Sequence, residues 1–597
     1  MTVRAFPLEH SPGLLYTVRT AMKQYKYFIV ITAFLSVVSM YCEQSEATLP
    51  ALRLAGKIID YVLMACVIGE TAVGIGTAKY KLHYIRTNAA SLAFTAVFVL
   101  LFCYAKFLYN SLASSSIAVL AIIIRNIFMV LRIYSRMKRV KGYVEKMLVN
   151  PAQTILMSFA AVILTGTLLL MMNFTTTDGR GLTFLQALFT STSCVCVTGL
   201  TVVDTATAFT FWGQLILIVL IQIGGLGIML LSYFTIYVIR RRVSLEDKMM
   251  LSYMLSDDDT AGIYRSMKNI VLTTFTIEGV GAVLLFAGFA VREGISLRSA
   301  WRALFHSVSA FCNAGFALYS DSLEGFRMNP YITLIIALLI ILGGIGFSCI
   351  TNIRAIADAA LHSKKRGAEG AAKKPALALN TKIVLIGTAI LLAAGTLIFY
   401  ILEYDNTMAD YRLGEQYLAA FFQSVTFRTA GFNSVPFGAL RPATYLIFCV
   451  FMVIGAASGS TAGGMKINTL AVLIASLRSY WRGEKYHRLG GSEIAADKVL
   501  QASIIFTADI VILIAAGALI SISDAAPVEH ILFEVCSALG TAGVTAGITA
   551  GLSAFAKVIL IALMFWGRLG ALTILSAGAS DSGKANIRFP QAEISIG

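Results

Sequence analysis

Leu-Phe-Thr-Ser-Thr-Ser-Cys-Val-Cys-Val-Thr-Gly-Leu, at residues 188–200, is the first of four segments that align without gaps around a central glycine. The others are Leu-Phe-His-Ser-Val-Ser-Ala-Phe-Cys-Asn-Ala-Gly-Phe at 304–316, Ala-Phe-Phe-Gln-Ser-Val-Thr-Phe-Arg-Thr-Ala-Gly-Phe at 420–432 and Leu-Phe-Glu-Val-Cys-Ser-Ala-Leu-Gly-Thr-Ala-Gly-Val at 532–544. The central glycines recur at intervals of 116, 116 and 112 residues, and a phenylalanine lies ten positions before each. Such a period is the mark of a repeat architecture, so we expect four structural repeats.

Each repeat has the same layout of apolar segments. In the first, a long apolar run at 155–172 is followed by a short amphipathic segment at 182–194, the glycine motif at 197–200 and a second long run at 212–239. About 20 apolar residues are needed to cross a bilayer, so the short segment cannot span it. We therefore expect a re-entrant helix and loop, which membranes tolerate only where the backbone lines a water-filled cavity.

The composition indicates a protein whose solvent is lipid. The chain is 57% hydrophobic and 13% charged, with a mean hydropathy of +0.77. Because the apolar runs are continuous rather than alternating, helices are favoured over a barrel. The net charge of +16 does not require a nucleic-acid partner, since the basic residues gather in short loops between the repeats, at 136–141, 240–242, 364–374 and 478–488. The positive-inside rule makes these loops cytoplasmic and the acidic loops external.

The predicted fold class is an all-α integral membrane protein with four tandem M1–P–M2 repeats around a pseudo-fourfold pore. The expected domains are an N-terminal four-span extension (1–148), repeat one (149–248), repeat two (249–366), repeat three with a broken second helix (367–490), repeat four (491–578) and a cytoplasmic tail (579–597). We expect a multi-pass protein of the plasma membrane. The first apolar run, at 28–41, has no small-residue cleavage site after it, so we expect it to be retained.

The role of the N-terminal extension stays open between two readings. Its second apolar run carries Asp60 and Glu70, and its fourth carries Arg125 and Arg132, which are seven residues apart and so lie on one helix face. A voltage sensor usually has charges at every third position. The spacing therefore allows either a sensor or a structural or docking bundle.

The glycine motifs suggest an ion filter. A pore that strips water from a monovalent cation must replace the water oxygens, and backbone carbonyls turned toward an axis can do this. Glycine adopts the required backbone angles at low cost. The alternative is that each glycine serves helix packing. The predicted filter residues, whose carbonyls would bind K⁺, are Val197, Thr198, Gly199, Asn313, Ala314, Gly315, Thr429, Ala430, Gly431, Thr541, Ala542 and Gly543.

Repeat three contains a glycine-rich break at 454–464 in its second helix, where we expect a gate. Helix-interior glycines each cost about 1 kcal/mol relative to alanine, so a continuous helix is not expected there. Two cations accompany it: Lys466 at the end of the break and Arg568 in the last apolar helix. A packing kink, snorkelling or a structural ion pair are the alternatives. The predicted gate residues are Gly455, Ser458, Gly459, Ser460, Thr461, Gly463, Gly464, Lys466 and Arg568.

Three further polar residues lie in or next to the short segments. His306 and Glu534 occupy one position, nine residues before their glycines. We expect His306 to make a polar contact, and Glu534 either to add negative charge or to bind neighbouring backbone. Arg428 is expected to brace the third filter segment. The sequence has no phosphate loop or paired catalytic carboxylates, so we expect neither an enzyme nor a bound cofactor.

Several motifs together resemble the Trk/Ktr/HKT superfamily of potassium transporters, in particular its KtrB- and TrkH-type membrane subunits. They are Val-Thr-Gly-Leu-Thr-Val-Val-Asp-Thr (197–205), Ile-Gln-Ile-Gly-Gly-Leu-Gly (221–227), Phe-Cys-Asn-Ala-Gly-Phe (311–316), Thr-Ala-Gly-Phe-Asn (429–433), Gly-Ser-Thr-Ala-Gly-Gly-Met-Lys (459–466) and Gly-Arg-Leu-Gly (567–570). The resemblance covers roughly residues 150–597, and the ending Phe-Pro-Gln-Ala-Glu-Ile-Ser-Ile-Gly is similar to that of KtrB.

The resemblance implies potassium uptake, with a loop in repeat three that blocks the pore from the cytoplasmic side. It also implies a homodimer above a cytoplasmic ring of nucleotide-binding RCK subunits. Glycine at all four filter positions favours potassium, because serine at the first position goes with sodium preference in the plant branch. The alternative is a sodium-coupled or sodium-selective transporter of the same fold. Two more distant alternatives are a secondary transporter and a structural or signalling subunit.

Overall fold

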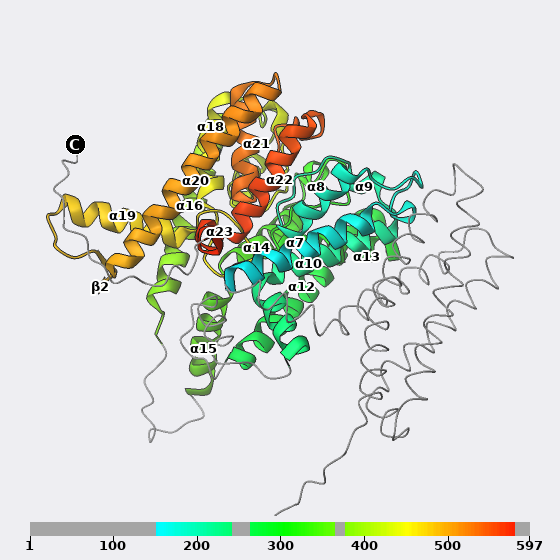
Figure 1. Ribbon diagram of the computed structural model, residues 1–597. Helices are drawn as coiled ribbons and strands as arrows, with labels where there is room; N and C mark the ends of the chain where they lie inside the picture. Colours follow the sequence, from blue (N-terminus) through cyan, green and yellow to red (C-terminus); the bar gives the residue numbers. More distant parts are fainter. Residues whose placement is uncertain (1–150, 241–262, 364–375, 579–597) are drawn as a thin grey trace, which may run out of the picture. The chain divides into compact units, whose positions relative to one another are not determined.

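The structure is a computed structural model that describes residues 151–240, 263–363 and 376–578 (Figure 1). The N-terminal extension, the linkers between these ranges and the C-terminal tail lie outside the described residues. The predictions made for them, including the sensor or docking bundle, therefore stay predictions.

Helices dominate the described residues, and one order of helices recurs four times. The long first helices are α7 (Pro151–Leu170), α12 (Ile263–Glu293), α16 (Leu379–Glu403) and α20 (Ala496–Ser523). The short helices that follow are α8 (Phe184–Val195), α13 (Leu297–Phe311), α17 (Leu413–Thr426) and α21 (Val528–Gly540). After each glycine come the second helices, α10 (Phe211–Arg240), α14 (Pro330–Gly344) with α15 (Phe347–Ser363), α18 (Pro442–Ile454) with α19 (Ile467–Trp481), and α22 (Ala554–Leu569) with α23 (Ala571–Gly578). The predicted all-helical fold class is confirmed for the described residues.

The remaining elements are short. They are α9 (Thr205–Ala208) and the 3₁₀ turns η1 (Asn173–Thr175), η2 (Glu324–Phe326), η3 (Phe437–Ala439) and η4 (Thr549–Gly551). The strands β1 (Arg488–Leu489) and β2 (Ser492–Glu493) form an antiparallel pair in which Arg488 lies opposite Glu493.

Local sequence signals fix where several of these helices begin. The Asn329 side chain accepts hydrogen bonds from the backbone N–H groups of Tyr331 and Ile332, and Pro330 occupies the first helical position of α14. Thr183 and Gln186 form a capping box at the start of α8. These caps satisfy N–H groups that a helix end leaves without partners, and so they set the point at which the chain re-enters the structure.

Three described helices are long and apolar enough to cross a membrane: 269–293 within α12, and all of α16 and α20. The number rises to five if each of two bent helix pairs counts as one span. α16 exposes an apolar stripe at helical spacing, formed by Ile386, Ile390, Leu397 and Ile401, each more than half exposed. Such a stripe is costly in water but suits a helix whose outer face meets lipid.

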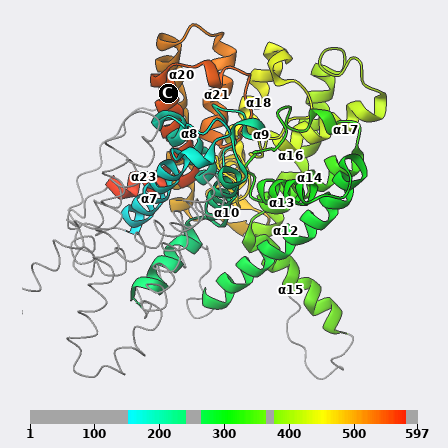
Figure 2. The ribbon, with the colours of Figure 1, turned by 90° about the vertical axis from the view of Figure 1, so that its right-hand side faces the viewer.

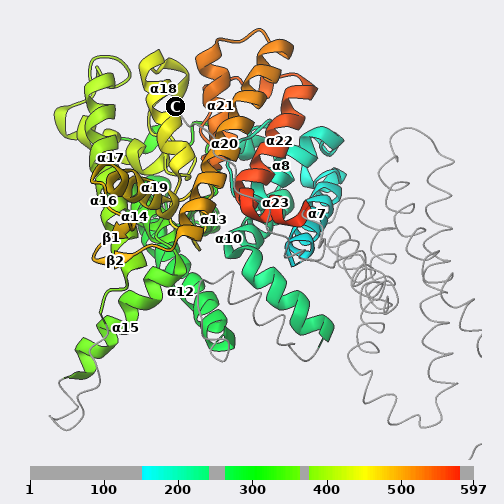
Figure 3. The same cartoon turned by 60° about the vertical axis from the view of Figure 1, so that its left-hand side comes forward.

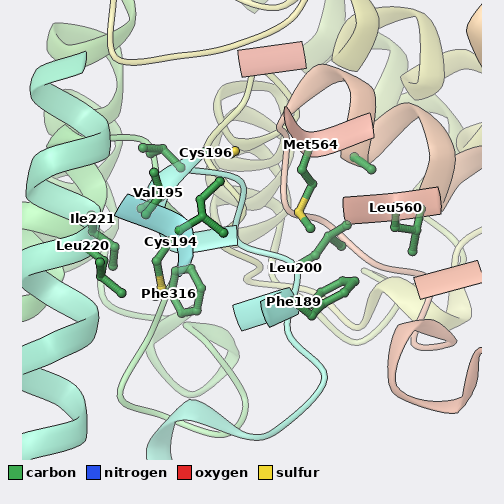
Figure 4. Close-up of a cluster of buried hydrophobic side chains, with 14 of the residues drawn as sticks. Phe189, Cys194, Val195, Cys196, Leu200, Leu220, Ile221, Phe316, Leu560 and Met564 are labelled. Carbon is green, nitrogen blue, oxygen red and sulfur yellow. The ribbon is translucent and has the colours of Figure 1, made fainter. Parts of the chain in front are cut away.

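The short helices pack inward, and the first and second helices of the repeats surround them. α12 and α14 both contact α13, and α20 and α22 both contact α21 (Figures 2 and 3). Phe189 of α8, Phe316 after the second glycine and Met564 of α22 share one buried cluster (Figure 4). Repeats one, two and four are therefore joined by a common apolar core.

Every repeat has a break in its second helix, whereas the sequence analysis expected one in repeat three only. The breaks in the other three repeats occur at Gly227, Gly346 and Gly570, which have φ values of 77°, 85° and 81°. The helix bends by 99° between α14 and α15 and by 97° between α22 and α23. The expectation of one continuous second helix at 212–239 is therefore wrong, because a left-handed glycine cannot continue a right-handed helix. The second helices of repeats two and four are interrupted for the same reason.

Candidate functional site

The four glycine segments (197–200, 313–316, 429–432 and 541–544) share an unusual backbone conformation. In each of them, both the central glycine and the residue two positions before it have a positive φ angle. The non-glycine residues are Val197 (55°), Asn313 (60°), Thr429 (69°) and Thr541 (51°). The left-handed region costs a non-glycine residue about 1–2 kcal/mol, so the surrounding structure must hold all four in place. This alternation gives the four segments a common backbone course, and all of their residues except Gly315 and Gly431 are buried.

The glycines meet around one centre. A Cβ atom built on any of them would lie within 3.2 Å of the carbonyl oxygen that precedes the glycine of the next repeat. The pairs, in order, are Gly199 with Ala314, Gly315 with Ala430, Gly431 with Ala542, and Gly543 with Thr198. The series closes on itself, so the segments form a ring in chain order. All of the sequence-predicted filter residues lie in this ring.

The short helices end three to five residues before the glycines, at Val195, Phe311, Thr426 and Gly540. The C-terminal end of a helix carries a partial negative charge. Three of these helices are tied to their first helices by a serine hydroxyl: Ser191 donates to the carbonyl of Ile163 (2.7 Å), Ser307 to that of Glu278 (2.6 Å) and Ser424 to that of Leu392 (2.9 Å). The helix ends therefore have a fixed direction relative to the ring.

Repeat three has one residue fewer between the buried phenylalanine of its short helix and its glycine, which the gapless alignment did not reveal. The residue before the glycine donates its N–H to a carbonyl five residues earlier in the other repeats, but Ala430 donates to Thr426, four residues earlier. The fully buried phenylalanine is accordingly Phe422, while Phe421 is only partly buried. The two adjacent phenylalanines allowed the sequence to be aligned in the wrong register.

Polar side chains of three short helices bind the segments just beyond the ring, through backbone or side-chain groups. His306 Nε2 accepts from the N–H of Leu318 (3.3 Å), and Gln423 Nε2 donates to Ser434 Oγ (2.9 Å). Glu534 accepts from the N–H of Ala546 (3.1 Å) and from the hydroxyls of two threonines, Thr545 and Thr549. The polar contact predicted for His306 is confirmed, and Glu534 follows the second of its two predicted roles.

The loop of repeat three (455–466) lies against residues of repeats two and four. Ala457 N and Thr461 N donate to the carbonyls of Gly344 and Gly343, at 3.1 and 3.3 Å, and Thr461 Oγ1 donates to the carbonyl of Phe311 (3.1 Å) at the end of α13. A side chain on Gly463 would collide with the side chain of Thr541, in the fourth glycine segment. The loop therefore sits directly against the ring.

The other predicted gate residues occupy different parts of the same loop. Gly455 and Gly464 face each other at its two ends, and both have left-handed backbone. Ser460 Oγ donates to the carbonyl of Ala457 (2.7 Å) and closes an internal turn. The carbonyl of Gly459, the residue after Ser458, accepts from the N–H of Phe347 at the start of α15 (3.1 Å). The loop thus contacts the bent part of repeat two.

The two cationic residues predicted for the gate, Arg568 and Lys466, bind different parts of the structure. Arg568 of α22 donates to the carbonyls of Thr461, in the loop, and of Gly224, in α10. It therefore connects repeats one, three and four. Lys466 Nζ donates to the carbonyl of Ala462 (2.6 Å), within the loop itself. Neither snorkels to the surface in this state.

Arg428 does not brace a filter carbonyl. Its guanidinium donates to Thr388 Oγ1 (3.3 Å), in α16. The side chain is almost fully buried, so it fixes the end of α17 against the first helix of its own repeat.

Sequence reasoning missed a buried carboxylate behind the second glycine segment. Glu278 of α12 is 2% exposed and accepts from Gln222 Nε2 of α10 (3.1 Å), while the thiol of Cys312 lies 3.6 Å from the same oxygen. A single acid in an apolar run was the only available signal. Through its bond to Gln222, the Glu278 carboxylate links repeats one and two behind the ring.

The comparisons with known proteins agree on one family. The family model for TrkH, described as a cation transport protein, matches residues 117–586. The chain is 35% identical over 450 residues to the Ktr system potassium uptake protein B of Bacillus subtilis (strain 168), covering 75% of this chain and 97% of that protein. It is 38% identical over 422 residues to the protein of the same name from Vibrio alginolyticus, covering 70% and 89%.

Two further matches extend this result. The potassium/sodium uptake protein NtpJ of Enterococcus hirae is 34% identical over 455 residues, covering 75% of this chain and 97% of that protein. The crystal structure of the potassium transporter TrkH from Vibrio parahaemolyticus matches with a TM-score of 0.59 at 17% identity, over 82% of this chain and 97% of that one. This structural match supports the fold alone. On the family model and the identities together, the chain belongs to the TrkH/Ktr family of membrane cation transporters, whose potassium uptake proteins are among its relatives.

Proposed function

We propose that this chain takes up potassium across the plasma membrane through a channel-like pore. The ring of four glycine segments is the selectivity filter, and the loop at 455–466 is the gate. The observation that carries the proposal is the closed series of glycine-to-carbonyl approaches, together with the left-handed residues two positions before each glycine. In this reading the chain is a conduit and not an enzyme, as the family description of cation transport also suggests.

The chemistry follows from the backbone. A potassium ion loses its water shell only where other oxygens replace it, and a ring of carbonyls supplies them at similar geometry. Carbonyls of the residues from Val197 to Gly199, and of their counterparts in the other repeats, would provide these oxygens. The partial negative ends of the short helices favour a cation at the same place. The ion is cargo, and no cofactor is needed.

The gate would act through the same contacts that hold the loop against the ring. In the described state Arg568 ties the loop to repeat one, and Thr461 ties it to α13. A guanidinium close to the filter also repels an approaching cation. Opening requires the loop to leave the ring, which the glycines at 455, 459 and 464 permit because they tolerate large backbone changes.

Regulation is proposed to come from a partner. We propose a homodimer of this chain above a cytoplasmic ring of RCK-type nucleotide-binding subunits, on the strength of the similarity to membrane proteins named for the Ktr system. Basic residues on the exposed end of α19 and the segment after it, such as Arg478, Arg482 and Lys485, offer a docking surface.

Rubidium and potassium uptake in a potassium-uptake-deficient bacterium tests the proposal. Expression of the chain should restore growth at low potassium and should produce saturable ⁸⁶Rb⁺ uptake. The same assay with and without sodium separates simple uptake from sodium coupling. Uptake that needs a sodium gradient, or that carries sodium in preference to rubidium, would replace the proposal with the sodium-coupled or sodium-selective alternative.

A further inference from the structure

The outer loop of repeat two is bonded to both neighbouring repeats, just outside the ring. Ser320 Oγ donates to Asp204 Oδ2 of repeat one (2.6 Å). On the other side, three residues of the loop bind one residue of repeat three, Asn433. This second connection, made by Ser322, Leu323, Glu324 and Asn433, is called the outer clamp below.

Asn433 uses its backbone and its side chain in the outer clamp. Its carbonyl accepts from Leu323 N (2.9 Å), its N–H donates to Ser322 Oγ (3.2 Å), and its Nδ2 donates to Glu324 Oε1 (2.7 Å). Asn433 lies two residues after the ring glycine Gly431. The three bonds therefore fix the outer end of the third glycine segment from a neighbouring repeat.

The loop that supplies these partners is itself held firmly. Arg292 of α12 donates to the carbonyl of Gly325 (2.5 Å), and its guanidinium lies over the ring of Phe326 at 4.5 Å. Arg327 stacks over Tyr411 of repeat three at 4.6 Å. The loop is thus anchored to its own first helix and to the outer surface of repeat three, as a support for Asn433 must be.

The matching positions in the other repeats lack this connection. They are occupied by Thr201, Ala317 and Thr545. Ala317 has no polar side chain, and Thr545 donates to Glu534 of its own repeat. Repeat three is also the repeat with one residue fewer between the buried phenylalanine of its short helix and its glycine, so its internal support differs from that of the others. A support from outside fits this difference.

We propose that Asn433 and Glu324 are positioning residues that set the ion selectivity of the filter. Discrimination between potassium and sodium depends on the spacing and number of the carbonyls in the ring. A glycine segment whose outer end is free relaxes around the smaller ion more easily. The inference rests on the proposed function. It adds that residues outside the ring hold the third of its four glycine segments in position.

The experiment exchanges the donor and the acceptor of the clamp. Asn433→Asp places two carboxylates against each other, and the double variant Asn433→Asp/Glu324→Gln restores a donor and an acceptor with reversed direction. In proteoliposomes, the ratio of ⁸⁶Rb⁺ to ²²Na⁺ uptake should fall about tenfold in Asn433→Asp and about fivefold in Asn433→Ala, as expected from losing the partly buried, charge-assisted hydrogen bond to Glu324. The double variant should return to within about threefold of the unaltered protein.

Two controls keep the outcomes separate. Asp178→Asn, at an exposed loop position whose carboxylate accepts from Arg180 N, should leave the ratio unchanged. Elution of each variant as a folded species in detergent shows that a changed ratio is not a result of unfolding, and the double variant tests the pairing even if Asn433→Ala does not fold. An unaltered ratio in both folded single variants, or failure of the double variant to recover, would overturn the clamp. Absence of ⁸⁶Rb⁺ uptake by the unaltered protein would instead overturn the proposed pore.

Discussion

At the scale of single residues, the ring glycines are constrained both by their own backbone and by their neighbours. Gly315 has a φ of 71°, and a Cβ on it would lie 2.7 Å from both the carbonyl oxygen of Ala430 and the Cα of Gly431. Neither neighbour is a flexible side-chain end that could move aside. The constraint therefore comes from the ring itself and applies to each of its members.

We expect Gly315→Ala to lower ⁸⁶Rb⁺ uptake by at least about tenfold, because the methyl group displaces the neighbouring carbonyl and alanine resists the left-handed backbone. Gly279→Ala is the matched control in the same repeat, since a Cβ there would meet no atom within 4 Å. Its uptake should equal that of the unaltered protein. Normal uptake by Gly315→Ala would show that the ring does not conduct.

A second residue, Glu403, holds the outer end of repeat three together. It is fully buried, and its two oxygens accept from Arg441 N (2.9 Å), Asn406 Nδ2 (2.7 Å), and the hydroxyls of Thr407 (3.0 Å) and Thr444 (2.5 Å). Each oxygen thus serves two donors. An amide nitrogen in place of either oxygen would face two donors and accept from neither.

Glu403→Gln should therefore destabilise the protein by about 2–4 kcal/mol, through lost hydrogen bonds and unpaired donors. The measurement is the midpoint of thermal unfolding in detergent. Asp405→Asn, two residues away, breaks an ion pair with Arg441 in which both side chains are over 40% exposed, and should cost less than about 1 kcal/mol. Equal midpoints for the two variants would contradict this account.

At the scale of elements, the sequence predicted which segments are helical but not how they end or align. The glycines of the ring were recognisable because their spacing recurs. The breaks at Gly227, Gly346 and Gly570 were not, since small residues in membrane helices usually indicate close packing. Each of these breaks has a second glycine three residues earlier in the chain. That earlier glycine does pack closely, as Gly343 does against the carbonyl of Phe311, while the glycine at the break takes a left-handed conformation. One motif therefore serves two purposes, which spacing cannot separate.

The outer clamp was beyond sequence reasoning for a different reason. Asn433 and Glu324 are 109 residues apart, and nothing in either local sequence names the other as its partner. Long-range hydrogen bonds between loops follow from the closed ring, which brings repeats two and three side by side. The repeats can be found from a period, but their mutual contacts depend on the assembled fold.

The outer loop of repeat two should also make selectivity sensitive to external pH. Burial and the nearby Asp321 raise the pKa of Glu324, while Asn433 and Arg327 only partly oppose this. Burial also raises the pKa of Asp204, but its hydrogen bonds from Ser320, Ala206 and Thr207 outweigh that and lower it overall. A raised pKa means that Glu324 takes up its proton at a higher pH than an ordinary glutamate does, whereas Asp204 stays ionised.

As external pH falls from about 7 to about 5, the neutral form of Glu324 should grow and its hydrogen bond from Asn433 should weaken. The ratio of ⁸⁶Rb⁺ to ²²Na⁺ uptake should then decrease in the unaltered protein. In Glu324→Gln the ratio should not vary over this range, and in Asp204→Asn it should vary as in the unaltered protein. A pH dependence that persists in Glu324→Gln would assign it to another group.

At the scale of the whole described molecule, the four repeats form a ring but do not have equal roles. Repeat three has one residue fewer between its buried phenylalanine and its glycine, and it also has the long break and the clamp. Repeat four supplies Arg568. Repeat two supports repeat three through its outer loop and through the carbonyls of Gly343 and Gly344 in α14. The near-symmetry is confined to the ring. The asymmetric contacts lie outside the ring, where the proposed pore would need them for selectivity and control.

Arg568 is where these asymmetric contacts converge, so its loss should affect the molecule as a unit. Its guanidinium donates to carbonyls of repeats one and three and belongs to repeat four. Arg568→Gln removes a charge-assisted connection to the loop, and in the proposed pore it also removes a positive charge from the path of the ion. Both changes favour conduction, so ⁸⁶Rb⁺ flux in proteoliposomes without a partner subunit should rise about tenfold. Arg441→Gln removes an arginine from an exposed ion pair and should leave the flux unchanged. A folded Arg568→Gln protein with lower flux would mean that this arginine holds the conducting state open, because the same contacts would then be needed for conduction rather than for closure.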